Sequence, residues 1–295
     1  MQQAGKLLWC LQYICTMLFF NCNGKFYSNN TPIIKAGNRG LRYGDGLFET
    51  MKMRNGVLIL EDEHFARLWK GMQVLQFTIP KHFTPDKLQD FILQTAIKNG
   101  HKKAARVRIT VYRSDGGLYD AADHFPNYII ETWALPEAIG ELNSNGLDVG
   151  IYTDVKKSCD ILSNLKHNNY LPYVMAALYA KKQKWNDALL INNRGNICDS
   201  TIANIFFIKD EIIYTPALSE GCVAGVMRKY IIVQMAKIGF TCMEKEISVN
   251  ELLNADEVFL SNSIYNLRWV KSIGESNFSN TSSKKIYSSM EPTIL

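Results

Sequence analysis

The chain has 295 residues, of which 47% are hydrophobic and 21% charged, and its formal net charge is +5. This composition is that of a globular protein with one large domain or two moderate ones. Lysine and arginine are scattered in runs no longer than pairs such as Lys102–Lys103, which argues against a nucleic-acid-binding protein. The small positive net charge is compatible with an anionic small-molecule ligand, and equally with a random distribution of charge over the surface.

The cysteines and histidines indicate neither disulfides nor a metal site. The seven cysteines are irregularly spaced, odd in number and without a C-x-x-C pair. This pattern favours reduced thiols in a cytosolic protein over a disulfide or zinc framework. The five histidines are scattered as well, so we expect no bound metal.

The first predicted feature along the chain is an apolar run, LLWCLQYICTMLFF, at residues 7–20. It is shorter than the ~20 residues of a membrane span, and no clear small-residue cleavage site follows it. The sequence from Met17 onward is typical of a protein start, so we expect residues 1–16 to be an extension or disordered. We also expect the protein to be cytoplasmic. A membrane-tethered protein is an alternative that rests on residues 7–20 alone.

The next segments predict an N-terminal domain over residues 17–135. Residues 18–60 are strand-like, with Asn-Gly turns at 23–24 and 55–56. A helix is expected over 61–77 and a second over 84–100, which Thr84 caps and Pro85 begins. Strands are expected over 104–114, where arginines alternate with Val107 and Ile109, and over 127–135.

Residues 136–146, PEAIGELNSNG, are rich in turn formers and are predicted to link this domain to a larger, β-rich one over 147–273. Helices are expected from 171 to 182, from about 225 to 237 and over 249–255, among strands that meet through tight turns. Residues 274–295 are polar, and we expect a flexible tail. The predicted fold class is α+β with two domains.

The expected helix at 171–182 raises a question about the lysine before it. Leu171, Val174, Met175 and Leu178 predict one apolar face. Lys166 precedes the positive end of this helix, where a lysine is not stabilising. Nearby positive charge favours the neutral amine, and a neutral amine is a nucleophile.

Separated stretches of the sequence together resemble the fold-type IV pyridoxal-phosphate enzymes, which include branched-chain aminotransferases, D-amino-acid aminotransferases and aminodeoxychorismate lyases. These stretches run from residue 18 to residue 272 in the order of the family: RGLRYGDGLFET (39–50), EHFARL (63–68), LKHNNYL (165–171), ANIFFIKDEIIYTP (203–216), GVMRKYII (225–232) and ADEVFLSNS (255–263). The resemblance implies a small N-terminal domain, a larger C-terminal domain and pyridoxal 5′-phosphate between them. It also implies a homodimer.

The resemblance implies roles for particular residues. Lys166 falls where the family places the lysine that forms a Schiff base with the cofactor and then acts as a base. Arg67 matches the phosphate anchor. Asp199 stands where the family normally has a glutamate at the ring nitrogen. The remaining expected phosphate contacts are the helix start at Gly225, Val226 and Met227, and the hydroxyl of Ser263.

The substrate side indicates the reaction. Thr50 falls where lyases of the family tend to have a hydroxyl, and Phe48 lies on the same face of its strand. Arg113 matches a position that binds a substrate carboxylate. The resemblance therefore favours a lyase that converts 4-amino-4-deoxychorismate to 4-aminobenzoate and pyruvate in folate biosynthesis. A branched-chain aminotransferase with 2-oxoglutarate as acceptor and a non-catalytic cofactor-binding protein are the alternatives.

Overall fold

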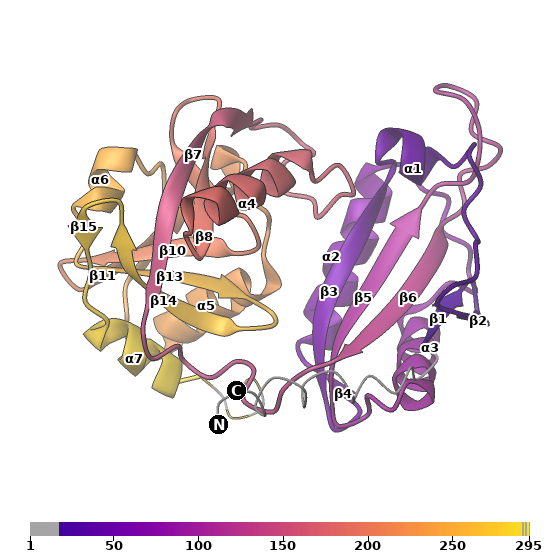
Figure 1. Ribbon diagram of the computed structural model, residues 1–295, viewed down its shortest axis with the longest axis horizontal. Helices are drawn as coiled ribbons and strands as arrows, with labels where there is room; N and C mark the ends of the chain where they lie inside the picture. The colour runs from indigo at the N-terminus through magenta and orange to yellow at the C-terminus, as the bar shows by residue number, and fades with distance from the viewer. Residues whose placement is uncertain (1–17, 291, 293, 295) are drawn as a thin grey trace, which may run out of the picture.

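The computed structural model describes residues 18–290, 292 and 294. Two β-sheets, each with its own helices, form two domains that lie side by side (Figure 1). The N-terminal sheet ends with residue 134 and the C-terminal sheet begins at residue 147. The expected α+β architecture with two domains is confirmed. The expected extension at residues 1–16 lies outside the described residues.

The N-terminal domain is built on a six-stranded sheet with the order β2-β1-β6-β5-β3-β4. Its strands are β1 (Phe19–Cys22), β2 (Lys25–Ser28), β3 (Gly46–Arg54), β4 (Val57–Leu58), β5 (Ala104–Tyr112) and β6 (Asn127–Ala134). Its helices are α1 (Arg39–Tyr43), α2 (Glu61–Val74) and α3 (Pro85–Lys98).

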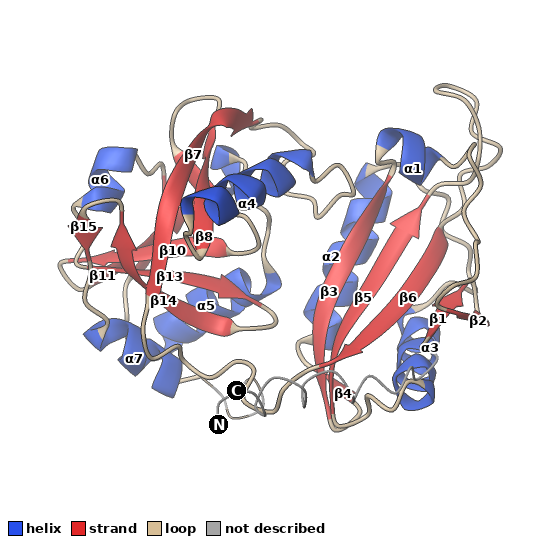
Figure 2. Cartoon of the chain, in the orientation of Figure 1, coloured by secondary structure: helices blue, strands red, loops and turns tan. Residues whose placement is uncertain are grey.

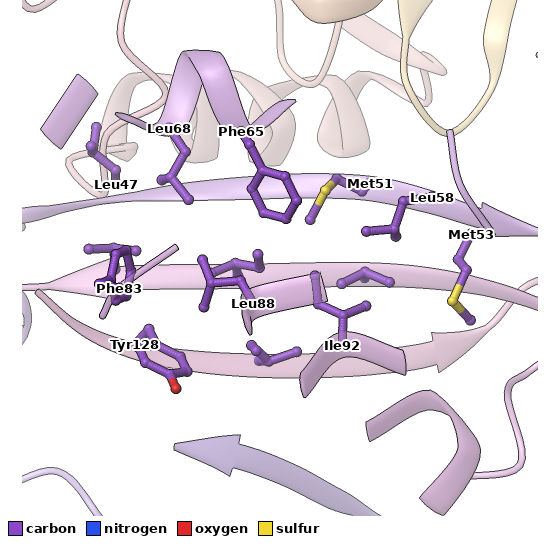
Figure 3. Packing of buried hydrophobic residues seen from close by; sticks show 14 of the residues in the cluster. Leu47, Met51, Met53, Leu58, Phe65, Leu68, Phe83, Leu88, Ile92 and Tyr128 are labelled. Atoms are coloured by element: carbon purple, nitrogen blue, oxygen red, sulfur yellow. The ribbon is translucent and has the colours of Figure 1, made fainter. Parts of the chain in front are cut away.

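Two helices, α2 and α3, cover one face of this sheet because apolar side chains alternate along its strands. Met51 of β3 is fully buried and packs in one cluster with Phe65 and Leu68 of α2 (Figure 3). The Thr84 side chain accepts a hydrogen bond from the Lys87 N–H, so α3 begins where its cap predicts. The opposite face of the sheet is left for the other domain.

The C-terminal domain is built on a nine-stranded sheet with the order β12-β11-β10-β13-β14-β7-β8-β9, and β15 pairs with β14. Its strands are β7 (Leu147–Lys157), β8 (Asp187–Asn192), β9 (Ile197–Ser200), β10 (Asn204–Lys209), β11 (Ile212–Pro216), β12 (Cys242–Lys245), β13 (Glu257–Asn262), β14 (Asn266–Ile273) and β15 (Ser276–Asn277).

Helices flank this second sheet (Figure 2). They are α4 (Leu171–Gln183), the 3₁₀ turn η1 (Leu218–Glu220), α5 (Val226–Lys237), α6 (Val249–Leu253) and α7 (Thr281–Ser288). Neighbouring residues of β10 point to opposite faces: Phe206 packs with α5 and α7, and Phe207 packs with α6. The central strands β8, β10 and β13 are buried on both faces and contain runs of apolar residues.

The apolar face predicted for α4 is wrong, although the helix itself is present. Leu171 is 63% exposed and Leu178 is 57% exposed, and Val174 and Met175 are exposed as well. The buried side of α4 consists of Tyr173 and two alanines, Ala176 and Ala180, which pack against Ala188 and Leu190 of β8. Small side chains let this helix approach the sheet closely, so the larger apolar residues are left on the outer side.

The flexible tail expected at 274–295 is also wrong over its first part, because β15 and α7 pack onto the C-terminal domain. Ile286 of α7 is fully buried in the cluster of Phe206 and Phe259. The Glu257 carboxylate accepts hydrogen bonds from the backbone N–H groups of Ser282 and Ser283, which begin the helix. The polar sequence of this helix gives no local sign of its start, because the carboxylate that caps it lies on a distant strand.

Among the described residues, no helix is both long enough and apolar enough to cross a membrane. The described cysteines, Cys22, Cys159, Cys198, Cys222 and Cys242, are free thiols.

Candidate active site

A cavity of about 670 Å³ lies between the two sheets and collects most of the residues that the sequence singled out. The N-terminal domain contributes Phe48, Thr50, Arg67, Arg106, Arg108 and Trp133 to its walls. The C-terminal domain contributes Lys166, Tyr170, Tyr173, Asp199, Asn204, Gly225, Val226, Met227, Ser261 and Ser263. Of the expected site residues, Arg113 alone does not line it.

The segment that carries Lys166 is joined to the open edge of β3. The Phe48 N–H donates to the Lys166 carbonyl O over 2.8 Å, and the Asn168 N–H donates to the Gly46 carbonyl O over 2.9 Å. A Cβ atom at Gly46 would lie 2.5 Å from Asn168 Nδ2 of this segment, and 2.1 Å from the Val111 carbonyl O of the neighbouring strand β5. The glycine in GDGLFET therefore allows this close approach, which ties the lysine of one domain to a strand of the other.

The amine of Lys166 is held among aromatic rings. Its Nζ lies 4.6 Å from the centre of the Phe48 ring and 5.4 Å from that of Tyr170. The pKa of Lys166 is lowered to about 7. Burial is the main cause and the Arg67 cation lowers the pKa further, whereas the charges of Glu49 and Asp199 raise it. A substantial part of this amine is therefore neutral and nucleophilic at neutral pH.

We expect the reactivity of Lys166 in the cofactor-free protein to rise with pH around a midpoint near 7, because only the neutral amine reacts. Reductive methylation between pH 5.5 and 9, followed by mass spectrometry of the Lys166 peptide, measures this midpoint. In urea the same lysine is expected to titrate near its ordinary value of 10.5. A folded-state midpoint above 9 would contradict the expectation.

Arg67 reaches the cavity from α2 and is fixed by a carboxylate. Its Nε and Nη2 donate to the two oxygens of Glu49 over 2.7 and 2.6 Å, and its Nη1 donates to the Ala224 carbonyl O over 3.0 Å. A guanidinium has five N–H donors, so one donor on each terminal nitrogen stays available for an anion. This geometry suits a phosphate.

The carboxylate of Glu49 also holds a histidine. His64 Nδ1 lies 2.7 Å from Glu49 Oε2, and both side chains are at most 1% exposed. Burial alone would raise the pKa of Glu49, but Arg67 and His64 outweigh burial and bring it to about 2. Burial lowers the pKa of His64. A neutral His64 donates its Nδ1–H to Glu49, so this contact is a hydrogen bond rather than an ion pair.

Acid should therefore remove a stabilising contribution of Glu49. Its folded-state pKa of about 2 lies below the ordinary value of 4.5, so this contribution is fully present above pH 4.5 and is lost as the pH falls toward 2. The full difference corresponds to about 3 kcal/mol in the free energy of unfolding. Urea unfolding between pH 5.5 and 3 should show the wild type converging on Glu49→Gln.

The matched control for this titration is Glu131→Gln. Burial raises the pKa of Glu131, so this carboxyl group disfavours the folded state above its pKa and cannot cause a loss of stability in acid. Glu131→Gln should therefore keep the acid sensitivity of the wild type. A constant difference between the wild type and Glu49→Gln at all pH values would contradict the assignment.

The start of α5 faces the cavity with free backbone donors. Gly225 precedes the helix, no side chain caps it, and Val226 and Met227 form its first turn. The first N–H groups of a helix have no partner within it and attract anions. A Cβ atom at Gly225 would lie 1.9 Å from Asn204 Oδ1, so only glycine allows the helix to begin here.

Two serine hydroxyls line the same cavity. Ser263 was expected from the sequence, and the structure places it in the lining. Ser261 was missed: it lines the cavity, and its buried Oγ has no hydrogen-bond partner among the described residues. An unpaired buried hydroxyl beside an anion site is an additional donor for that anion.

Asp199 lies in the cavity wall at the end that Tyr173 and Asn204 share. The carboxylate is 2% exposed and accepts hydrogen bonds from the Tyr173 hydroxyl over 2.8 Å and from the Asn204 amide over 3.0 Å. A buried, hydrogen-bonded carboxylate of this kind can accept a hydrogen bond from a protonated ring nitrogen.

The expectation for Arg113 needs correction. Its guanidinium contacts the Asp45 carboxylate over 3.0 Å and His124 Nδ1 over 2.9 Å, and it stacks on the Phe77 ring. The side chain is 7% exposed and does not reach the cavity. Arg113 follows the end of β5, where the chain turns, so its side chain is used to hold the loop together.

Arg106 and Arg108 take the place that was expected of Arg113. They lie on the cavity face of β5, where Arg108 pairs across the strands with Thr50. The Arg108 guanidinium lies 3.9 Å from the centre of the Phe48 ring, and its charge interacts with that of Glu131, the residue paired with it on β6. Their alternation with buried valine and isoleucine was visible in the sequence, but their strand pairing was not.

Tyr170 was missed as well. It lines the cavity four residues after Lys166, and its ring stacks on Tyr173 with centres 4.0 Å apart. Tyr170 belongs to the stretch LKHNNYL, whose resemblance to the family was the signal that could have identified it. Burial raises the pKa of Tyr170, so its hydroxyl stays protonated and can donate a hydrogen bond.

The side chains of the cavity fit pyridoxal 5′-phosphate. A partly neutral lysine can meet an aldehyde, Arg67 and the start of α5 can hold a phosphate dianion, and Asp199 can pair with a ring nitrogen. The described residues contain no cluster of histidine, cysteine and acidic side chains that could hold a metal ion.

Comparison with known proteins agrees with this geometry. Residues 46–273 match the family described as Amino-transferase class IV. The chain is 27% identical to an aminodeoxychorismate lyase of Vibrio harveyi, over 84% of this chain and 91% of the relative. It is equally 27% identical to a putative branched-chain-amino-acid aminotransferase of Methanocaldococcus jannaschii, over 81% of this chain and 82% of the relative.

A solved structure shares the fold. The branched-chain aminotransferase of Thermoproteus uzoniensis superposes with a TM-score of 0.81 at 21% identity, and the match covers 92% of this chain and 93% of that one. Class IV aminotransferases use pyridoxal 5′-phosphate, so the expected cofactor is confirmed at the level of the family. The family match spans more than half of the sequence and covers strands of both sheets, and we conclude that this chain belongs to the class IV aminotransferases, the pyridoxal-phosphate enzymes of fold type IV.

Proposed function

We propose that this protein is an aminodeoxychorismate lyase that converts 4-amino-4-deoxychorismate to 4-aminobenzoate and pyruvate. The observation that carries the proposal is the pair of arginines on the cavity face of β5. Arg106 and Arg108 are two residues apart on one strand face, so their Cα atoms are about 7 Å apart. The described residues offer these two guanidiniums one nearby carboxylate, Glu131 on β6, and none in salt-bridge contact. The pair can therefore bind a substrate with two carboxylates, as 4-amino-4-deoxychorismate has.

The hydroxyl of Thr50 supports the same choice. It lines the cavity directly opposite Arg108 in the strand pairing, so a substrate held by Arg108 lies beside a hydroxyl. A branched-chain side chain would instead leave two guanidiniums and a hydroxyl without partners, which costs binding energy.

Each residue then has one task in the reaction. The bound cofactor supplies an aldehyde that captures the substrate amine and a ring that accepts electrons. Arg106 and Arg108 bind the carboxylates and orient the substrate ring, and the Lys166 amine removes the proton from its amine-bearing carbon. The pyruvyl ether oxygen takes a proton from Thr50 or Lys166 as it leaves, and the ring becomes aromatic. No other reactant is consumed.

A coupled assay tests the proposal. The purified protein, loaded with pyridoxal 5′-phosphate, is combined with an aminodeoxychorismate synthase, and the appearance of 4-aminobenzoate is followed. We expect 4-aminobenzoate to form, and we expect borohydride to fix the cofactor covalently to Lys166. Absence of 4-aminobenzoate together with rapid leucine-dependent formation of glutamate would overturn the lyase assignment.

Branched-chain amino transfer to 2-oxoglutarate is the second candidate, and the rim of the cavity favours it. Phe48, Trp133, Val174, Ile202 and Ile264 give part of the lining an apolar character. This surface could receive an aliphatic side chain, and Arg108 could receive the second carboxylate of 2-oxoglutarate. The same assay separates the two reactions by product. No observation favours a non-catalytic binding protein.

We propose a cytoplasmic homodimer, and the exposed face of α4 supports the association. Leu171, Val174, Met175 and Leu178 form an apolar stripe on the outer side of this helix. Exposed stripes of this kind mark interfaces between proteins. Val174 also lines the cavity, so a second copy seated on α4 would lie close to the site. Sedimentation equilibrium of the purified protein measures the association directly, and a monomer at micromolar concentration would contradict it.

A further inference from the structure

A buried lysine that takes no part in the reaction described above contacts Asp199. Lys157 ends β7, is 7% exposed and does not line the cavity. Its ammonium donates to Asp199 Oδ2 over 2.7 Å, to the Gly221 carbonyl O over 2.6 Å, and to the Tyr173 hydroxyl. A buried ammonium is tolerated only with partners of this kind, so the arrangement needs an explanation beyond packing.

The hydrogen bonds of Asp199 are unequally divided between its oxygens. Oδ2 accepts from Lys157, from the Tyr173 hydroxyl over 2.8 Å and from the Val223 N–H over 3.0 Å. Among the described residues, Oδ1 accepts only from the Asn204 amide, over 3.0 Å. A carboxylate oxygen offers about two lone-pair sites, so Oδ2 is fully used and Oδ1 can accept one more donor.

We propose that Lys157 is a positioning residue that keeps Asp199 ionised, leaves Oδ1 as its free acceptor, and thereby holds a proton on the ring nitrogen of the bound cofactor. The proposal rests on the function proposed above, in which Asp199 is the partner of that nitrogen. It assigns to Lys157 the task of completing a carboxylate that is one methylene shorter than the glutamate expected at this position.

The loaded site offers two places for one proton. The proton can lie on the ring nitrogen beside an ionised Asp199, or on Asp199 beside a neutral ring. The Lys157 ammonium touches the carboxylate and lies farther from the cavity, so it favours the ionised carboxylate more than it opposes the ring cation. Burial alone would lower the pKa of Lys157, but Asp199 outweighs burial and raises it, so the ammonium persists at neutral pH.

The test uses cofactor labelled with ¹⁵N at the ring nitrogen and reads its chemical shift at pH 7 in the loaded protein. We expect a protonated-ring shift in the wild type and a neutral-ring shift in Lys157→Met, with the dissociation constant of the cofactor raised on the order of tenfold. Lys157→Arg, which keeps the charge, should restore the wild-type shift. Lys156→Met is the matched control, because Lys156 is the exposed neighbour in the sequence.

A second variant serves as a control in case Lys157→Met does not fold. Lys157→Gln keeps a donor for Asp199 but carries no charge, and it should give the neutral-ring shift even if Lys157→Met does not fold. A protonated-ring shift in Lys157→Gln would overturn the proposal. Failure of the underlying function is distinguishable, because a wild type that borohydride cannot label at Lys166 would refute the cofactor site itself, whatever Lys157 does.

Discussion

Lys166→Met is expected to lower the rate of 4-aminobenzoate formation by about 10⁴-fold, because it removes the amine that both captures the cofactor and moves the proton. The amine is partly neutral at pH 7, with a pKa of about 7, and it lies inside the cavity shared by both domains. No second lysine lines that cavity among the described residues, so no other side chain replaces it. The rate is measured by chromatography of the product under saturating cofactor.

A measurement of cofactor binding distinguishes the loss of the Lys166 amine from unfolding of the variant. Arg67, the start of α5 and the serine hydroxyls are unchanged in Lys166→Met, so the variant should still bind pyridoxal 5′-phosphate, but borohydride should not fix it to the chain. Lys156→Met, a change of the same kind at an exposed position, should keep wild-type activity and labelling. Activity of Lys166→Met within tenfold of the wild type would remove Lys166 from the reaction.

Much of the fold could be predicted from the sequence because its local signals agree with its long-range packing. Thr84 and Pro85 begin α3 as their cap pattern indicates, and the stripe of Phe65 and Leu68 is the buried side of α2. These elements bury the face that their own periodicity marks. Local pattern and tertiary contact point the same way here, so the sequence is sufficient.

The predictions failed where a distant partner decides the outcome. Leu171 and Leu178 have helical spacing, yet the sheet beneath α4 accepts Ala176 and Ala180. The α7 helix is polar in sequence and is begun by the carboxylate of Glu257 on β13. Neither result is encoded near the residues concerned, so periodicity and propensity cannot find it.

The candidate site shows the same division. Family motifs around Lys166 and Arg67 predicted both as site residues, and the structure brings both side chains to one cavity. Ser261 and Arg108 were missed because their place depends on strand register. Pairing of Thr50 with Arg108 sets the guanidinium on the cavity face, and a sequence without that pairing gives no reason to prefer Arg108 over Arg113.

Arg108→Met should lower activity but not stability, and Arg113→Met should lower stability but not substrate affinity. This contrast tests the assignment of the substrate-binding arginine. Arg108 lines the cavity and faces the substrate, so its loss should lower kcat/KM for 4-amino-4-deoxychorismate by about 10²- to 10³-fold, as expected for a charged bidentate contact. The free energy of unfolding should change little. Steady-state kinetics and urea unfolding measure the two quantities on the same preparation.

Arg113→Met should instead destabilise the protein by about 1–3 kcal/mol, because it removes a charged hydrogen-bond partner of Asp45, although Arg39 still pairs with that carboxylate. The fraction that remains folded should bind substrate with a nearly normal KM, since Arg113 does not reach the cavity. A raised KM in a fully stable Arg113→Met protein would return the carboxylate site to Arg113. Loss of stability without loss of affinity places that site on the open face of β5, where the strand pairing already sets Thr50 beside Arg108.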